Sequence, residues 1–160
     1  MQISKHFKLS EFIKSQVGTR NGIKNMPGSG EIKNLGNVAY EILEPVRAKF
    51  EKPVMINSGF RCLELNRKIG SSDSSQHTKG MAVDFEIIGT PNIQVAYWIQ
   101  NNCDFDQLIL EFYKPDEDNA GWIHASYCDG NNRKQVLTFD GKSYSDGLPD
   151  MEWKDGKVKL

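Results

Sequence analysis

The sequence predicts an α+β domain in which helices pack on a small antiparallel sheet. One long segment repeats its apolar residues at helical spacing, and several short segments alternate apolar and polar residues as strands do. Two of the strand segments flank a polar, turn-rich loop, which is typical of a hairpin. The 160 residues suffice for one domain. We therefore expect a single domain over 1–160, with a motif-bearing core at about 7–127 and a C-terminal extension at 133–160.

The helices are predicted from apolar periodicity and from the residues at their ends. A short helix is expected within 7–16, with Ser10 as a candidate N-cap, followed by a Gly-, Asn- and Pro-rich loop at 18–30. The clearest helix covers 31–50, and Pro45 inside its pattern predicts a break or kink. Two shorter helices, the second with a proline near its first turn, are expected at 63–69 and 91–102.

The strands are predicted from alternation and from the turns that bound them. In the segment 81–88, Asp84 and Glu86 alternate with the apolar residues and so project to the other face. The loop 114–121 joins the two strands of the expected hairpin. Beyond an Asp140-Gly141 turn the chain carries little signal. The expected strands are 54–57, 81–88, 108–113, 122–127 and 135–139.

Composition excludes several classes of protein. The net charge of -1 argues against a nucleic-acid partner, which usually requires a basic face. No stretch approaches the roughly 20 apolar residues of a membrane helix, and the first residues lack the apolar core of a secretory signal. We expect a protein made in the cytoplasm. Three cysteines without C-x-x-C spacing indicate free thiols in a reducing compartment: Cys62, Cys103 and Cys128.

Three residues are candidate metal ligands: His77, Asp84 and His124. A His, a carboxylate and a second His, with room for a water, form the ligand set of a catalytic zinc. On one helix, His77 and Asp84 would lie about 10 Å apart along the axis, too far to share an ion. Gly80 lets the chain turn back, so that Asp84 falls in the following strand. The alternative for Asp84 alone is a surface carboxylate on a half-exposed strand.

Glu111 is the candidate general base. If the hairpin strands are symmetric about the loop 114–121, Tyr113 faces Trp122 and Glu111 faces His124, with paired Cβ atoms about 5 Å apart. A zinc hydrolase needs a base that takes a proton from the water and returns it to the leaving amine. A one-residue slip in register would place Glu111 on the wrong face, and a structural role stays open. The rival carboxylates lie in the loop: Asp116, Glu117 and Asp118.

Arg61 follows Ser58-Gly59-Phe60 at the exit of a strand. A fixed guanidinium at this place could bind a substrate carboxylate or stabilise a developing oxyanion. It could equally fasten the loop to the body of the protein. The residues alone leave both roles open.

These motifs resemble the zinc D-alanyl-D-alanine peptidase family, which has the hedgehog/DD-peptidase fold. That family includes D-Ala-D-Ala carboxypeptidases, the D-Ala-D-Ala dipeptidases of vancomycin resistance, and phage endolysins that cut L-alanyl-D-glutamate bonds. The upstream motifs are similar to a short, phage-associated branch that includes endolysin-type peptidases, and the resemblance covers roughly 7–127. It is carried by Ser75-x-His77-x-x-Gly80-x-Ala82-x-Asp84, Trp122-x-His124, Phe7-x-Leu9-Ser10-Glu11-Phe12, and Ile56-Asn57-Ser58-Gly59-Phe60-Arg61 with Leu65-Asn66.

The resemblance implies roles for individual residues. His77, Asp84 and His124 would be the zinc ligands. Arg61 would contact the substrate carbonyl or carboxylate, and Ser75 would help to hold the substrate.

One position departs from the family pattern. Several members place an acidic base three residues before the last ligand, where this chain has Gly121. The base role then falls to Glu111, or the enzyme is impaired.

The leading hypothesis is a zinc metallopeptidase that hydrolyses a peptide bond in the stem peptide of bacterial peptidoglycan. The bond could be that of a D-Ala-D-Ala carboxypeptidase or of an L-Ala-D-Glu endopeptidase. The absence of a signal peptide fits a phage or prophage lysis protein that reaches the wall after release, or a virion-associated enzyme. The alternatives are a non-catalytic zinc-containing module that binds peptidoglycan and an α+β domain without metal. The sequence does not indicate an oligomeric state.

Overall fold

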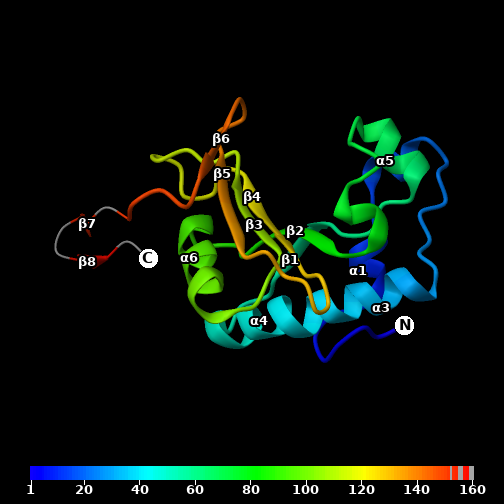
Figure 1. Ribbon diagram of the computed structural model, residues 1–160, viewed down its shortest axis with the longest axis horizontal. Coiled ribbons are helices and arrows are strands. Elements are labelled where there is room, and N and C mark those ends of the chain that lie inside the picture. The colour runs from blue at the N-terminus through cyan, green and yellow to red at the C-terminus, as the bar shows by residue number, and fades with distance from the viewer. Residues whose placement is uncertain (152, 155–156, 159–160) are drawn as a thin grey trace.

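The computed structural model describes residues 1–151, 153–154 and 157–158, the last four by their backbone alone. Its centre is a six-stranded sheet in the order β1-β2-β4-β3-β5-β6, flanked by helices (Figure 1). The α+β class is therefore confirmed. The strands of this sheet are β1 (Met55–Ser58), β2 (Ala82–Glu86), β3 (Gln107–Glu111), β4 (Trp122–Ser126), β5 (Gln135–Phe139) and β6 (Tyr144–Asp146).

The sheet is mixed, although we expected an antiparallel one. Every neighbouring pair is antiparallel except β3 and β5, which run parallel. The segment after β4 returns to the start of β3, where Lys134 and Gln135 donate backbone hydrogen bonds to Phe105 and Asp106. That return places β5 in the same direction as β3. A separate two-stranded ladder joins β7 (Trp153–Lys154) to β8 (Lys157–Val158).

The helices arise largely where periodicity and turn residues predict them. α3 and α4 form one long run beneath the sheet, α6 lies beside it, and α5 lies on the opposite side (Figure 1). No helix in the described part of the chain has the length and apolar character that a membrane span requires. The helices are α1 (Leu9–Ile13), α2 (Gln16–Arg20), α3 (Ser29–Val38), the π-helical η1 (Ala39–Leu43), α4 (Glu44–Phe50), α5 (Leu63–Ile69), the 3₁₀ turn η2 (Gln76–Lys79) and α6 (Asn92–Asn102).

The N-terminal helices differ from the prediction in two ways. Ser10 lies inside α1; the helix begins after Lys8, whose backbone N–H donates to the Glu11 carboxylate at 2.7 Å. A second short helix, α2, occupies part of the segment expected to be a loop. Ser15 caps it by accepting a hydrogen bond from the Gly18 backbone N–H at 3.1 Å.

Pro45 does not break the long helix. It has no N–H, and its ring would crowd the carbonyl oxygen four residues earlier in a regular α-helix. The preceding turn widens into η1, and the Glu44 N–H bonds to the Ala39 carbonyl, five residues back. The helix then continues as α4 to Phe50. The expected interruption thus takes the form of a π-helical turn.

The two faces of the central strands have different roles. One face of β2, β3 and β4 packs on the helices and forms the core. The other face carries Asp84 and His124, which are paired across β2 and β4. The strands are therefore held by the core while their alternate residues remain available for chemistry. The core positions of these three strands are Val83, Phe85, Leu108, Leu110, Ile123 and Ala125.

Candidate metal centre

His77, Asp84 and His124 meet in space. One possible ligand atom from each lies within 4.8 Å of the others, and all three residues are buried. Asp84 and His124 are brought together by the register of β2 and β4. His77 comes from η2, which precedes β2 in the chain. The structure therefore assembles the three residues that the sequence singles out as metal ligands.

A short turn positions His77. Ser75 caps η2, and its hydroxyl accepts a hydrogen bond from the His77 backbone N–H at 3.3 Å. Gly80 ends the turn with φ +69°, a conformation that favours glycine. A Cβ at Gly80 would lie 2.5 Å from the Glu31 carbonyl oxygen of α3. The turn therefore packs closely on α3, and Gly80 reverses the chain as expected.

The hydrogen bonds of His77 leave one ring nitrogen facing the carboxylate. Nδ1 lies 2.7 Å from the Gly59 carbonyl oxygen, which only accepts, so Nδ1 carries the proton. Nε2 lies 3.4 Å from Asp84 Oδ2. Burial lowers the pKa of His77 and favours the neutral ring, although the Asp84 charge opposes this. In that form the Nε2 lone pair faces a carboxylate oxygen, an arrangement that a shared cation would stabilise.

Asp84 is an ionised carboxylate between two imidazoles. Burial alone would raise its pKa, but the interactions with His77 and His124 outweigh burial and hold the pKa well below its usual range. Asp84 Oδ1 lies 2.9 Å from His124 Nδ1. The other ring nitrogen of His124, Nε2, is buried and has no hydrogen-bond partner among the described residues. Two nitrogens and a carboxylate around one point suit zinc.

Glu111 lies beside this cluster, but not by the register we expected. β3 and β4 form the predicted hairpin, yet Glu111 pairs with Trp122 and Ile109 pairs with His124. The pairing thus differs by two residues on β3, which keeps Glu111 on the face of His124. Glu111 Oε1 lies 3.8 Å from His124 Nδ1. Burial, followed by the charge of Asp84, raises the pKa of Glu111 to about 6.

The rival carboxylates do not belong to the buried cluster found among the described residues. Asp116, Glu117 and Asp118 are exposed, as expected for a solvated loop.

Arg61 is held by three side chains. Its Nε donates to Ser58 Oγ at 3.0 Å, and its two terminal nitrogens lie 3.3 Å from Asn66 Oδ1 and 3.4 Å from Asp84 Oδ2. Only 12% of the Arg61 side chain is exposed. The guanidinium is therefore fixed beside the carboxylate of the cluster, and its backbone also bonds to the His77 carbonyl.

A family model described as Peptidase M15 matches residues 5–124 of the chain. The chain belongs to the peptidase M15 family. Its members are zinc peptidases of the D-Ala-D-Ala carboxypeptidase type, in agreement with the resemblance in the sequence. No curated protein matches the chain. The matched segment ends at His124, so that it contains all three residues of the buried cluster.

The M15 assignment and the cluster together define the chemistry available. M15 peptidases depend on zinc, and His77, Asp84 and His124 are the described residues that could hold the ion. The lone-pair arrangement at His77 and the unpartnered nitrogen of His124 fit such an ion. Ser75 is placed as the cap of η2, and its predicted contact with substrate stays a prediction.

Asn66 and Asn25 are supporting residues that sequence reasoning missed. Asn66 is fully buried; its Oδ1 accepts from Arg61, and its Nδ2 donates to the Ser72 carbonyl at 2.7 Å. Asn25 accepts from the Cys62 backbone N–H and donates to the carbonyls of Ile13 and Phe60. Both fix the turn that carries Arg61. Asn66 had a signal in the Leu65-Asn66 motif, whereas Asn25 lies in a loop without one.

Proposed function

We propose that this M15 peptidase hydrolyses a peptide bond in the stem peptide of bacterial peptidoglycan, with zinc as its cofactor. The observation that carries the proposal is the position of Glu111. Its carboxylate lies 3.8 Å from His124, at the edge of a buried cluster whose other two members are His77 and Asp84. A ligand set with a carboxylate beside it is the minimum that a zinc peptidase needs.

The ion supplies part of the chemistry: when bound, zinc polarises the scissile carbonyl and lowers the pKa of water to about 7. Glu111 supplies the proton transfer. Its carboxylate takes a proton from the attacking water and delivers it to the nitrogen of the leaving amine as the C–N bond breaks. A pKa raised to about 6 leaves Glu111 mostly ionised at neutral pH and more basic than an ordinary carboxylate.

Arg61 supplies positive charge beside Asp84. Its guanidinium is held by Ser58 and Asn66 and lies 3.4 Å from Asp84. Because the side chain is fixed in advance, little reorganisation is needed when negative charge develops on the substrate oxygen. Arg61 would thus stabilise the carbonyl oxygen or bind a carboxylate of the substrate, and Ser75 would assist in holding the peptide.

Two bonds remain candidates, D-Ala-D-Ala and L-Ala-D-Glu, because both are cut by relatives of this type. The upstream motifs favour the endolysin-type branch, and thus a role in phage or prophage lysis, either after release or in the virion. A non-catalytic module that binds peptidoglycan is the second candidate, and the glycine at position 121 is the observation that favours it.

Digestion of purified peptidoglycan tests the proposal. Wild type and His77→Ala would be compared by mass spectrometry of the released fragments and by metal analysis of both proteins. New amino termini or lost D-Ala in the wild type alone, together with about one zinc per chain in the wild type, would support a peptidase and name the bond. Stoichiometric zinc without cleavage of any muropeptide would contradict the peptidase proposal and support the non-catalytic binding module.

A further inference from the structure

Four aromatic side chains form a surface beside Glu111. The Phe112 ring contacts the rings of Trp122 and Phe139, with centroid distances of 4.9 and 5.1 Å. Tyr144 stacks on Phe139 with a centroid distance of 4.5 Å. None of the four belongs to the core that the described residues form, and Phe112 and Tyr144 are 40% and 59% exposed. We call these four residues the aromatic surface. A contiguous exposed group of this kind indicates a binding site.

Strand register places the aromatic surface on the face that carries the metal centre. Trp122 pairs with Glu111 across β4 and β3, and Glu111 pairs with Phe139 across β3 and β5. Phe139 pairs in turn with Tyr144 across β5 and β6. Because paired residues project to the same side of a sheet, Tyr144 lies two strands from the candidate general base on the same face. Partial burial, followed by the charge of Glu111, raises the pKa of Tyr144, in agreement with this proximity.

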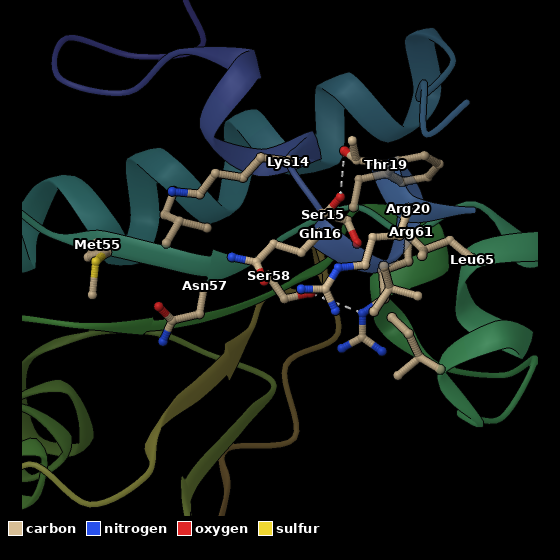
Figure 2. Close-up of a pocket in the computed structure, with 14 residues that line it drawn as sticks. Lys14, Ser15, Gln16, Thr19, Arg20, Met55, Asn57, Ser58, Arg61 and Leu65 are labelled. Atoms are coloured by element: carbon tan, nitrogen blue, oxygen red, sulfur yellow. Dashed lines mark hydrogen bonds between the residues drawn. The ribbon is translucent and has the colours of Figure 1, made fainter. Parts of the chain in front are cut away.

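The metal centre lies between two different ends of this face. In the strand order it falls on β2 and β4, with β1 on one side and β5 and β6 on the other. At β1, Ser58 and Arg61 line a cavity of about 800 Å³, which Figure 2 shows. At the other end, β6 is exposed along its whole length. A ligand bound at the metal centre can therefore extend over β5 and β6.

The charged groups at this end suit a ligand that is uncharged and rich in hydroxyl groups. Asp146 lies two residues after Tyr144 on β6 and so projects to the same face. It forms no ion pair in the part of the chain that the structure describes. The turn between β5 and β6 carries one charge of each sign, Asp140 and Lys142. Carboxylates such as Asp146 and Glu111 accept hydrogen bonds from hydroxyl groups and repel anions.

A pyranose ring combines the two properties that this end of the face would recognise. One side of the ring presents C–H groups, which pack on an aromatic ring because the ring face carries partial negative charge. The hydroxyl groups at its edge donate hydrogen bonds to carboxylates. The proposed function supplies such a ring, because the stem peptides of peptidoglycan are attached to a glycan strand.

We propose that the aromatic surface binds a sugar ring of the peptidoglycan glycan strand while the attached stem peptide occupies the metal centre. The inference rests on the proposed function, because it assigns a further part of the same substrate. Tyr144 offers its exposed ring face to the sugar, and Phe139 supports the Tyr144 ring by stacking on its other side. Asp146 accepts hydrogen bonds from the hydroxyl groups of the sugar.

Titration with glycan strands that carry no peptide tests the surface. An amidase releases such strands from peptidoglycan, and tryptophan emission reports binding because Trp122 belongs to the aromatic surface. Wild type is compared with Tyr144→Ser, Tyr144→Phe, Asp146→Ala and the matched control Tyr40→Ser. Tyr40 is 61% exposed, as Tyr144 is to a similar extent, but it lies on η1. Circular dichroism checks the folding of each variant.

We expect the wild type and Tyr144→Phe to bind the glycan with similar Kd values, because the ring provides the stacking. Tyr144→Ser should raise Kd about 10-fold, and Asp146→Ala should raise it by a similar factor. Tyr40→Ser should leave Kd unchanged. Equal Kd values for wild type and Tyr144→Ser, or no binding by the wild type, would overturn the proposal. A wild-type dimer that becomes a monomer in Tyr144→Ser would also overturn it, because the surface would then bind a second copy of the chain.

Failure of the sugar site and failure of the proposed function give different results. Cleavage of a stem peptide with and without its sugar is measured in parallel, and the wild type should have the lower KM for the sugar-bearing form. Tyr144→Ser should lose this preference. If the wild type cleaves the peptide but binds no glycan, only the sugar site is wrong. If the wild type binds the glycan through Tyr144 but cleaves neither form, the sugar site stands and the peptidase proposal fails.

Discussion

Gly121 lies against the backbone of Glu111. A Cβ at Gly121 would be 1.7 Å from the Glu111 carbonyl oxygen and 2.9 Å from that of Phe112. Gly121 has φ +69°, and Phe112 is itself left-handed, with φ +54°. No acidic side chain could replace this glycine without moving the strand that carries Glu111. The departure from the family pattern at position 121 is thus a requirement of this hairpin, whose opposite strand presents a carboxylate instead.

Gly121→Ala should destabilise the protein. The substitution combines a positive φ with a clash against backbone, and we expect a loss of about 3 kcal/mol in the free energy of unfolding. Urea denaturation measures it. Gly36→Ala is the control, because a Cβ at Gly36 meets nothing within 4 Å and helical alanine should stabilise α3 by about 0.5–1 kcal/mol. Equal stability of Gly121→Ala and wild type would contradict the close approach.

Glu111→Gln should abolish most of the activity and keep the metal. Removal of a general base costs about 10²- to 10⁴-fold in rate, whereas His77, Asp84 and His124 are untouched. Rate assays on muropeptides and metal analysis on the same samples measure both effects. Glu117→Gln is the matched control, since Glu117 is exposed and its side chain forms a surface ion pair with Lys114. If Glu111→Gln were fully active, another group would have to be the general base.

Removal of zinc should lower the melting temperature. The ion binds the folded state only, so a concentration of 100 times Kd adds about 2.7 kcal/mol to stability. Differential scanning calorimetry with chelator, with added zinc and with added magnesium measures the shift. Magnesium prefers oxygen ligands, so added magnesium should not shift the melting temperature. In Asp84→Asn the zinc-dependent shift should shrink or vanish, and a wild type insensitive to zinc would argue against the metal centre.

Acid should lower the free energy of unfolding, partly because Asp106 becomes protonated. Its carboxylate accepts hydrogen bonds from Arg133 and Gln76. The bonds from Arg133 lower the pKa of Asp106 to about 2, although burial acts in the opposite direction. Because the pKa is lower in the folded protein than in the unfolded chain, where it is near 4, the ionised carboxylate stabilises the fold at pH values above about 4. This contribution to the free energy of unfolding is lost as the pH falls from about 4 towards 2. The full contribution is about 2 kcal/mol.

Urea unfolding at pH 6 and at pH 3 measures this dependence. Asp106→Asn should be less stable at pH 6 and should lose less stability on acidification than wild type. The same pH dependence in both proteins would show that other groups account for the acid sensitivity.

The sequence was most informative where residue type and spacing act together. His77, Asp84 and His124 could be selected because zinc accepts few side chains and Gly80 marks the reversal between the first two. Glu111 could be placed on the correct face because strand alternation has period two, although the pairing was wrong by two residues. The tight backbone at Phe112 and Gly121 sets the register, and a left-handed phenylalanine has no sequence signal.

Other features depend on tertiary contacts that a local pattern does not encode. α2 has only five residues, too few for a helical period, and its neighbours hold it in place. β6 is exposed along its whole length, so that it shows no apolar alternation. The parallel pairing of β5 depends on the return of the chain to Asp106. The roles of Asn25 and Asn66 arise from buried hydrogen bonds between distant segments.

The division of β2 and β4 into a core face and a site face has an evolutionary consequence. Val83 and Ile123 are constrained by their packing in the core. Asp84 and His124, each the next residue along its strand, are constrained by their place in the cluster. Successive side chains of a strand point to opposite faces, so a substitution at a core position changes the packing while the neighbouring ligand keeps its place in the strand. Mutation can therefore alter the core and the site separately.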